Sequence, residues 1–370
     1  MTNSVREHRF VFLDGLRGIA AISIVLSHFA RTLEVGDIFP HSKLSVDFFF
    51  LLSGFVVAFA YDRRLRDGRK TLLSFATTRL IRLYPMLLLG MSIGAIVFFF
   101  RIASRAEWDL SIPLVEALVL GALMLPSHVI TGPGYTSAFP LNVPVWSLFF
   151  QISINALYAI SARHLTTPRL AMVTAVGALG LTITAYEHNG IFGGTEWTSL
   201  LLGSWRILFS FSAGVLLFRL SERLLRDRLR KAPPGYVPLV LAAAMCAALA
   251  LPLQVTWLYD ALCVFFLFPM IVAVGAETQI SGRPAELCLF AGRLSYPLYV
   301  LHYPGVHVAR LIASHYDLHG ASLDLFFVAT LGGVIAFSSI CLIYIDEPVR
   351  AALTRWSRKE RIENRAAVGA

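Results

Sequence analysis

Charged residues are scarce in this sequence. They make up 15% of its 370 residues, while 56% are hydrophobic, and the mean hydropathy is +0.68. A soluble protein of this size needs more polar surface than that. The shortage excludes an ordinary soluble domain and places most of the chain in lipid. There each backbone group must bond within its own segment, and the apolar runs are too long for barrel strands, so they predict helices.

Cysteines are also few. The four that occur lie in or beside apolar runs, without the paired spacing of a zinc site or a redox motif, so we interpret them as packing residues. We expect neither a metal nor a bound cofactor. The N-terminus lacks the small-residue cleavage site of a signal peptide, and the first apolar run contains Asp14 and Arg17. We therefore expect this run to be a retained first span.

The net charge of +9 does not indicate a nucleic-acid partner, because no basic stripe is interleaved with aromatic residues. In a membrane protein, basic residues report orientation first. They cluster in four places, which the positive-inside rule assigns to the cytoplasm: Arg6 and Arg9, residues 63–82, residues 219–231, and residues 350–365.

Eleven apolar runs are candidates for helices, with boundaries good to a few residues. They are 11–30, 46–60, 83–100, 112–126, 143–162, 170–186, 199–218, 236–252, 256–275, 289–312 and 322–345.

The number of crossings follows from the basic clusters. Two clusters on the same side need an even number of crossings between them, yet five runs lie between Arg82 and Arg219. The weakest is 112–126, which is short and carries Glu116, so we expect a re-entrant or interfacial element there. The fold class predicted is thus all-α: a polytopic integral membrane helix bundle of about ten spans, with both termini cytoplasmic.

The whole chain, 1–370, is interpreted as a single transmembrane domain with a core at 10–350 and a basic cytoplasmic tail at 351–370. No repeat is visible. The pair Gly90 and Gly94 predicts close helix packing.

Titratable residues inside spans are costly and therefore candidates for function. Arg17 and His28 are 11 positions apart, which places them on one helix face about 16 Å apart along the axis. Histidine is suited to take a proton from a hydroxyl, and arginine to bind phosphate or carboxylate. The alternative is that Arg17 snorkels or pairs with Asp14 and that His28 is only an interfacial residue.

Further candidates follow in the next two runs. Asp47 begins the second span, where it would orient His28 or act as a helix N-terminal cap, and Ser53 lies midway. Arg79 and Arg82 share one helix face near the cytoplasmic surface. These two arginines would hold a phosphate-bearing donor or anchor the helix to anionic lipid.

Seven motifs in order resemble those of acyltransferase family 3: LDGLRGIAAISIVLSHF, VDFFFLLSGF, RLIRLYP, PVWSLFF, RILFSFSAG, GRLSYPLYVLHYPG and DEPVR. The likeness covers about residues 10 to 350, and as an ordered set the motifs are specific. It implies a bacterial inner-membrane enzyme without a bound cofactor. That enzyme would move an acyl group, usually acetyl, from cytoplasmic acyl-CoA to a hydroxyl of a surface polysaccharide, lipopolysaccharide or glycolipid.

The resemblance also implies roles for individual residues. His28 matches the family's catalytic base and Arg17 its motif partner; with Asp47 they form the expected catalytic set. Arg79 and Arg82 match the donor-side arginines. Supporting positions in or beside the motifs are Asp14, Ser53, Trp146, Gln151, Arg206, Tyr296, His302 and Glu347.

One position departs from the family pattern. Gln151 stands where the family commonly has glutamate, and a neutral amide cannot act as a base. If relatives use that glutamate to move a proton, Asp47 or another carboxylate must do so here.

Direct transfer is the favoured mechanism, since no G-x-S-x-G elbow presents a nucleophile, although Ser53 and Ser147 remain candidates for an acyl-enzyme. The alternative function is a secondary transporter or flippase of the acceptor, for which an inverted repeat would be expected. A third alternative, a structural or sensory protein, leaves the alignment of Arg17 and His28 unexplained.

Overall fold

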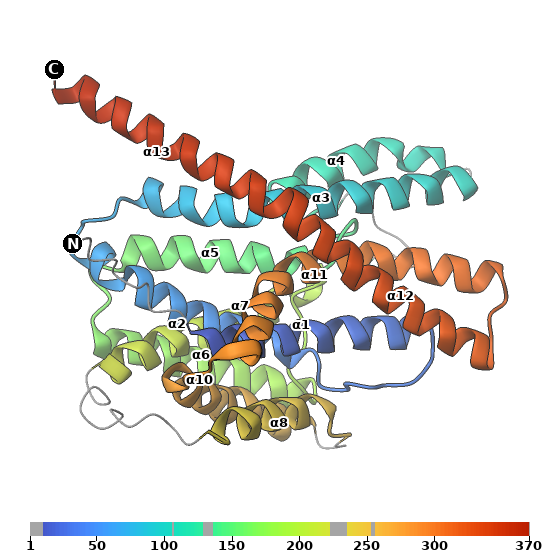
Figure 1. Ribbon diagram of the computed structural model, residues 1–370, viewed down its shortest axis with the longest axis horizontal. Helices are drawn as coiled ribbons and strands as arrows, with labels where there is room; N and C mark the ends of the chain where they lie inside the picture. The colour runs from blue at the N-terminus through green and yellow to red at the C-terminus, as the bar shows by residue number, and fades with distance from the viewer. Residues whose placement is uncertain (1–9, 106, 129–135, 223–234, 253–255, 370) are drawn as a thin grey trace.

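The computed structural model describes residues 10–369 except 106, 129–135, 223–234 and 253–255 (Figure 1). Within these residues the chain is helical, and its one β-contact is an isolated bridge between Ser137 and Glu196. Each of the eleven predicted runs forms helix. The first half contains α1 (Val11–Thr32), α2 (Leu44–Arg66), α3 (Leu72–Arg105), α4 (Ser111–Ala122), α5 (Val145–Ser161) and α6 (Thr167–Glu187).

The second half continues the same pattern. Two of its helices contain a π-helical turn, one between α9 and α10 and the other between α12 and α13. The elements are α7 (Leu200–Leu220), α8 (Val237–Ala250), α9 (Thr256–Leu262), η4 (Cys263–Leu267), α10 (Phe268–Glu277), α11 (Gly282–His315), α12 (Gly320–Cys341), η5 (Leu342–Asp346) and α13 (Glu347–Gly369).

Seven helices in the described residues are long and apolar enough to cross a membrane. The expected count of ten is therefore not confirmed. The apolar helices α5 and α8 are shorter, and α11, although 34 residues long, is interrupted by polar residues and by two prolines. α4 has 12 residues, about 18 Å, against a hydrocarbon core of about 30 Å. It is too short for a full span, as expected for 112–126.

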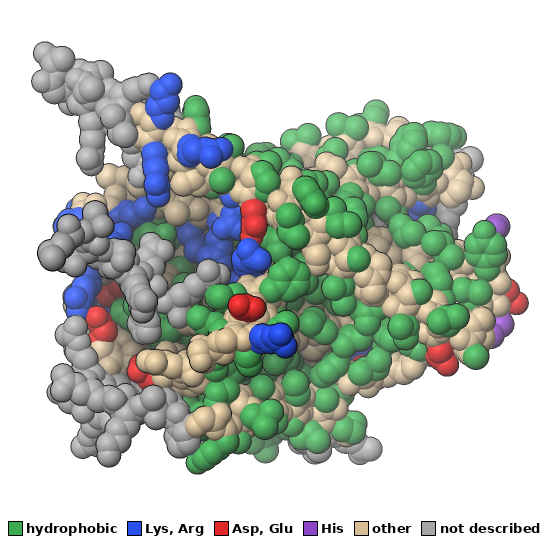
Figure 2. All heavy atoms as spheres, in the orientation of Figure 1, with side chains coloured by type: hydrophobic (Ala, Val, Ile, Leu, Met, Phe, Trp, Pro, Cys, Tyr) green, Lys and Arg blue, Asp and Glu red, His purple; other side chains and the backbone are tan. Residues whose placement is uncertain are grey.

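Apolar side chains cover much of the face of the molecule shown in Figure 2. In the segment Gly320–Lys359, which contains α12 and part of α13, only 17% of the most apolar 18-residue stretch is buried inside the molecule. Exposed Leu, Ile, Val and Phe side chains also lie along α3, α4 and α6. A soluble monomer does not expose apolar surface on this scale. The outward-facing residues are those that a bilayer would cover.

α1 and α11 pack closely and run in the same direction. Gly15 lies against Cys288, and Gly18 lies against Ala291 one turn further along both helices. A side chain at either glycine would overlap its neighbour, so the small residues set this close approach. The candidate base on α1 is thereby placed against α11.

Two buried ion pairs join α2 and α7. Asp47 pairs with Arg206 near the start of both helices (2.7 Å), and Asp62 pairs with Arg219 near their ends (2.6 Å). The two helices therefore run parallel. The directions of α1 with α11 and α2 with α7 are those that the ten-span topology requires, while the count itself stays a prediction.

Lysine and arginine gather at one end of the molecule, the left-hand end in Figure 2, where α1 begins and α13 ends (Figure 1). The predicted basic clusters 63–82 and 350–358 contribute to this end. Arg6 and Arg9, residues 223–231, and the side chains beyond Lys359 lie outside the described part of the chain. The gathering at one end agrees with the expectation that the clusters share a side of the membrane.

Candidate active site

His28 on α1 meets His302 on α11. His28 Nδ1 lies 2.9 Å from His302 Nε2, and the rings are stacked with centroids 5.1 Å apart. His302 is fully buried. The two residues are 274 positions apart in the chain, and the close packing of α1 on α11 brings them together.

The hydrogen bonds define which nitrogen carries each proton when both rings are neutral. His302 Nδ1 lies 2.7 Å from the carbonyl oxygen of Tyr299 and 3.2 Å from that of Leu298. A carbonyl only accepts, so His302 Nδ1 donates and its Nε2 is the acceptor. His28 Nδ1 therefore donates to His302. The lone pair of His28 is left on Nε2, which makes no hydrogen bond with the described residues.

His28 lines a cavity of about 430 Å³, which we call the large cavity. This volume is in the range of small-molecule sites. Its wall combines aromatic rings with cationic side chains. These are Trp146, Phe192, Tyr299 and Tyr303, together with Arg31, Lys43, Arg206 and Arg310.

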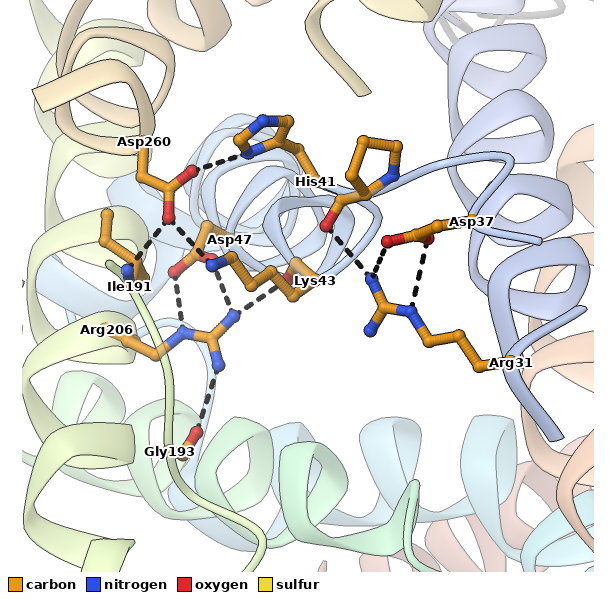
Figure 3. A network of polar contacts seen from close by, with 10 residues as sticks. Arg31, Asp37, His41, Lys43, Asp47, Ile191, Gly193, Arg206 and Asp260 are labelled. Atoms are coloured by element: carbon orange, nitrogen blue, oxygen red, sulfur yellow. Dashed lines mark hydrogen bonds and ion pairs between the residues drawn. The ribbon is translucent and has the colours of Figure 1, made fainter. Parts of the chain in front are cut away.

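Arg206 lines the large cavity, and the buried Asp47 holds it from behind the wall (Figure 3). The Arg206 guanidinium donates to both Asp47 oxygens, at 3.2 and 2.7 Å, and to the carbonyls of Gly193 and Lys43. Two roles were left open for Asp47, and neither is seen. The contact with His28 is not formed, because Arg206 bonds both carboxylate oxygens and His302 bonds His28, and no described side chain caps the start of α2. Trp146 stacks on the same guanidinium, 5.1 Å away.

A second buried carboxylate, Asp260 on α9, supports the neighbouring wall (Figure 3). It accepts from His41 Nδ1 (2.9 Å), Lys43 Nζ (3.0 Å) and the backbone N–H of Ile191 (2.9 Å). Sequence reasoning did not single out this residue. A carboxylate inside an apolar run was the available signal, the same one that selected Arg17 and His28.

A separate small cavity of about 90 Å³ is lined by Arg17, Ser53, Arg79 and Arg82, with apolar residues of α2. The sequence-predicted donor residues and Ser53 thus lie together. Arg79 and Arg82 form no ion pair with the described residues, and the Nε of Arg79 is buried without a hydrogen-bond partner. Two such guanidinium groups are suited to bind an anion.

Contacts with three of the described residues help to hold Arg17 in place. It donates to the Ser295 hydroxyl (2.9 Å) and to the carbonyl of Gly292, and it pairs with Asp14 at 3.4 Å. The pairing with Asp14 was one of the two alternatives left open by the sequence. Although it pairs with Asp14, Arg17 also lines the small cavity and therefore stays a candidate for binding a ligand there.

The rings of Phe49 and Tyr299 lie between the two cavities. Phe49 lines the small cavity and Tyr299 the large one, and their centroids are 5.9 Å apart in an edge-to-face arrangement. Tyr299 is fixed by the hydroxyl of Ser147 (2.9 Å), which itself donates to the carbonyl of Pro144. We call the rings of Phe49 and Tyr299 the partition. Ser147 thus supports it by holding the Tyr299 hydroxyl.

The remaining predicted residues lie outside both cavities. Tyr296 donates to the carbonyl of Leu83 (2.5 Å), next to Arg82 in the chain, and so ties α11 to α3. Glu347 forms a half-exposed ion pair with Arg293 (3.2 Å). Gln151 is buried on α5, and its amide nitrogen has no described partner. No group of three His, Cys, Asp or Glu suited to a metal ion occurs among the residues that the structure describes.

Comparison with known proteins gives a consistent result. The family model described as "Acyltransferase domain" matches residues 10–345. "Protein 2 in picA locus" of Rhizobium radiobacter is 37% identical over 188 residues, which cover 48% of this chain and 96% of that protein. No solved structure matches the chain.

Two further relatives carry names that describe an activity. "Putative membrane-bound transacylase BcsY" of Komagataeibacter xylinus is 26% identical over 84% of this chain and 76% of its own length. "Putative O-acetyltransferase SACOL0978" of Staphylococcus aureus (strain COL) is 24% identical over 91% of this chain, which spans 57% of that protein.

Proposed function

The chain belongs to the acyltransferase 3 family of integral membrane acyltransferases, and from this premise we propose that it moves an acyl group, foremost acetyl, from acyl-CoA to a hydroxyl of a carbohydrate acceptor. The acceptor class is a surface polysaccharide, a lipopolysaccharide or a glycolipid. The names of the relatives in Komagataeibacter xylinus and Staphylococcus aureus support the acyl and acetyl parts of this proposal.

The observation that carries the proposal is the hydrogen-bond chain that ends at His28. The carbonyl of Tyr299 fixes His302, and His302 fixes His28, so that the His28 lone pair remains on Nε2 in a residue that lines the large cavity. This arrangement is that of a general base held by a second group. His302 is a positioning residue in this scheme.

In the proposed reaction, His28 Nε2 removes the proton of the acceptor hydroxyl. The oxygen attacks the thioester carbonyl, the carbon–sulfur bond breaks, and the CoA sulfur leaves with the proton from His28. His302 Nε2 accepts the Nδ1–H of His28 throughout, which stabilises the imidazolium that forms. The products are the acyl ester and free CoA.

The small cavity supports a role on the donor side. At about 90 Å³ it is too small for a whole CoA, and its arginines Arg17, Arg79 and Arg82 suit a phosphate at the mouth of the donor path. The acyl end must then pass between Phe49 and Tyr299 to reach His28. In this proposal the donor enters at the basic end of the molecule, which the positive-inside rule assigns to the cytoplasm, and the enzyme lies in the bacterial inner membrane.

The test uses the purified chain in nanodiscs with radiolabelled acetyl-CoA and a surface-glycan extract as acceptor. Wild type should move label to the extract, and His28→Ala should reduce transfer by at least about 100-fold, the scale of general-base catalysis. His315→Ala, which changes an exposed histidine at the end of α11, is the matched control and should transfer as wild type does.

Folding is checked separately by size-exclusion profile and thermal unfolding. Full activity in a well-folded His28→Ala protein would contradict the role of His28. Absence of both acetyl-CoA binding and transfer in wild type would contradict the proposed donor.

A further inference from the structure

The described lining of the large cavity is cationic. Arg31, Lys43, Arg206 and Arg310 reach its wall, together with His28 and His307, and no Asp or Glu occurs among the described residues that line it. The cations come from α1, α7, α11 and the segment before α2. A cavity with one sign of charge concentrates ligands of the opposite sign.

Three of these cations form ion pairs with carboxylates that do not line the cavity (Figure 3). Arg206 pairs with Asp47 and Lys43 with Asp260, and both carboxylates have no exposed surface. Arg31 pairs with Asp37, which is half-exposed. The carboxylates fix the cations without entering the cavity.

The pKa of Lys43 reflects this crowding. Burial lowers it most, Asp260 opposes the lowering, and the nearby Arg206 and Arg31 lower it further. The cations of the wall are thus close enough to act on one another, and an anion in the cavity would relieve this repulsion.

Arg310 is the unbalanced member of the set. It forms no ion pair and no hydrogen bond with any residue that the structure describes. It follows His302 by eight positions on α11, about 12 Å or two turns further along the helix. Tyr303 lies between His302 and Arg310 in the chain, and its ring is 5.8 Å from that of His28 and 5.0 Å from that of His307.

We propose that the large cavity selects an anionic acceptor: a sugar chain that carries a carboxylate or phosphate, bound by Arg310, on the acylated residue or its neighbour. The inference rests on the proposed function, because it assigns the acceptor to the cavity that His28 lines. A guanidinium binds either anion through two parallel hydrogen bonds. Tyr303 and Trp146 supply apolar ring faces for the sugar between the anion and the reacting hydroxyl.

The test measures acetyl transfer with purified protein in phosphatidylcholine nanodiscs. One preparation of surface-polysaccharide oligosaccharides is divided into three portions: untreated, carboxyl-reduced with carbodiimide and borohydride, and dephosphorylated with hydrogen fluoride. For wild type, KM should rise about tenfold, equivalent to about 1.4 kcal/mol, in the portion that has lost the recognised anion. The portion affected identifies carboxylate or phosphate.

Variants then locate the effect. Arg310→Gln should raise KM for the untreated portion about tenfold and make the three portions equivalent, whereas Arg310→Lys should keep part of the discrimination. Arg283→Gln is the matched control, since it removes an exposed arginine at the opposite end of α11, away from both cavities. It should behave as wild type.

Failure of the inference and failure of the proposed function give different results. Transfer to all three portions with equal KM, or an unchanged KM in Arg310→Gln, overturns the anionic acceptor alone. No transfer to any portion overturns the proposed function and this inference with it. If the effect of Arg310→Gln occurs only in nanodiscs with anionic lipid, Arg310 binds a headgroup and the inference is wrong.

Discussion

His28 and Arg17 illustrate what can be predicted at the scale of single residues. Their spacing and the cost of placing them in lipid select them, and both indeed contact α11. Their partners could not be predicted from the chain, because His302 and Ser295 are brought to them by tertiary packing. For the same reason the partner of Asp47, which is Arg206 on α7, could not be predicted from the sequence.

The contact between His28 and His302 leads to a prediction on turnover. His302→Ala removes the acceptor for His28 Nδ1–H, and kcat should fall about 100-fold with little change in KM, because ground-state binding is not touched. His302→Gln retains a carbonyl oxygen that can accept the same hydrogen bond. It should recover about tenfold of the loss.

Steady-state kinetics with the glycan acceptor give the kcat and KM of both variants. A purely structural role for His302 would instead lower the amount of folded protein in both variants equally, without recovery by glutamine.

At the scale of helices, each apolar run of the sequence located a helix, but not the full length of that helix. The run 83–100 lies within α3, which already begins at Leu72, because Arg79 and Arg82 interrupt the apolar pattern without ending the helix. The π-helical turns at η4 and η5 have no signal in the pattern. Pairing between helices depends on contacts such as Asp62 with Arg219, which join segments 157 residues apart.

The α2–α7 ion pairs predict how these helices respond to mutation. Asp62→Ala leaves the buried Arg219 guanidinium without its counter-ion and should lower the free energy of unfolding by about 3–5 kcal/mol. Replacing both residues, as in Asp62→Ala with Arg219→Met, should recover most of this loss, because no uncompensated charge remains.

Thermal unfolding in detergent measures the effect. Asp67→Ala is the control, since its ion pair with Arg69 lies at the surface and should leave stability unchanged. A double variant no more stable than Asp62→Ala would contradict the expectation that the loss comes from the uncompensated charge of Arg219.

At the scale of the whole molecule, the fold class and membrane character could be predicted from composition, but the span count could not be fixed. The short helices α4, α5 and α8 and the polar helix α11 fall outside simple length and hydropathy rules. The two cavities could not be predicted at all, since each combines residues from several helices. The partition likewise forms only where α2, which carries Phe49, meets α11, which carries Tyr299.

The partition predicts a side reaction when it is opened. Phe49→Ala removes a ring that separates the proposed donor path from the His28 cavity. Water would then reach the thioester, and acetyl-CoA hydrolysis without acceptor should rise severalfold over wild type. Release of free CoA measures it, with Phe100→Ala, which changes an exposed residue of α3, as control. Unchanged hydrolysis would show that other residues also exclude water.

The same pair of rings bears on the membrane itself. A protein with polar cavities on both sides of one constriction becomes a channel for protons if the cavities join. Because the rings of Phe49 and Tyr299 lie between the cavities, each passage of an acyl chain along the proposed donor path would have to keep the constriction filled, either by the rings or by the chain that displaces them. On the proposed donor path, the enzyme would then work across the bilayer without dissipating the electrochemical gradient on which the cell depends.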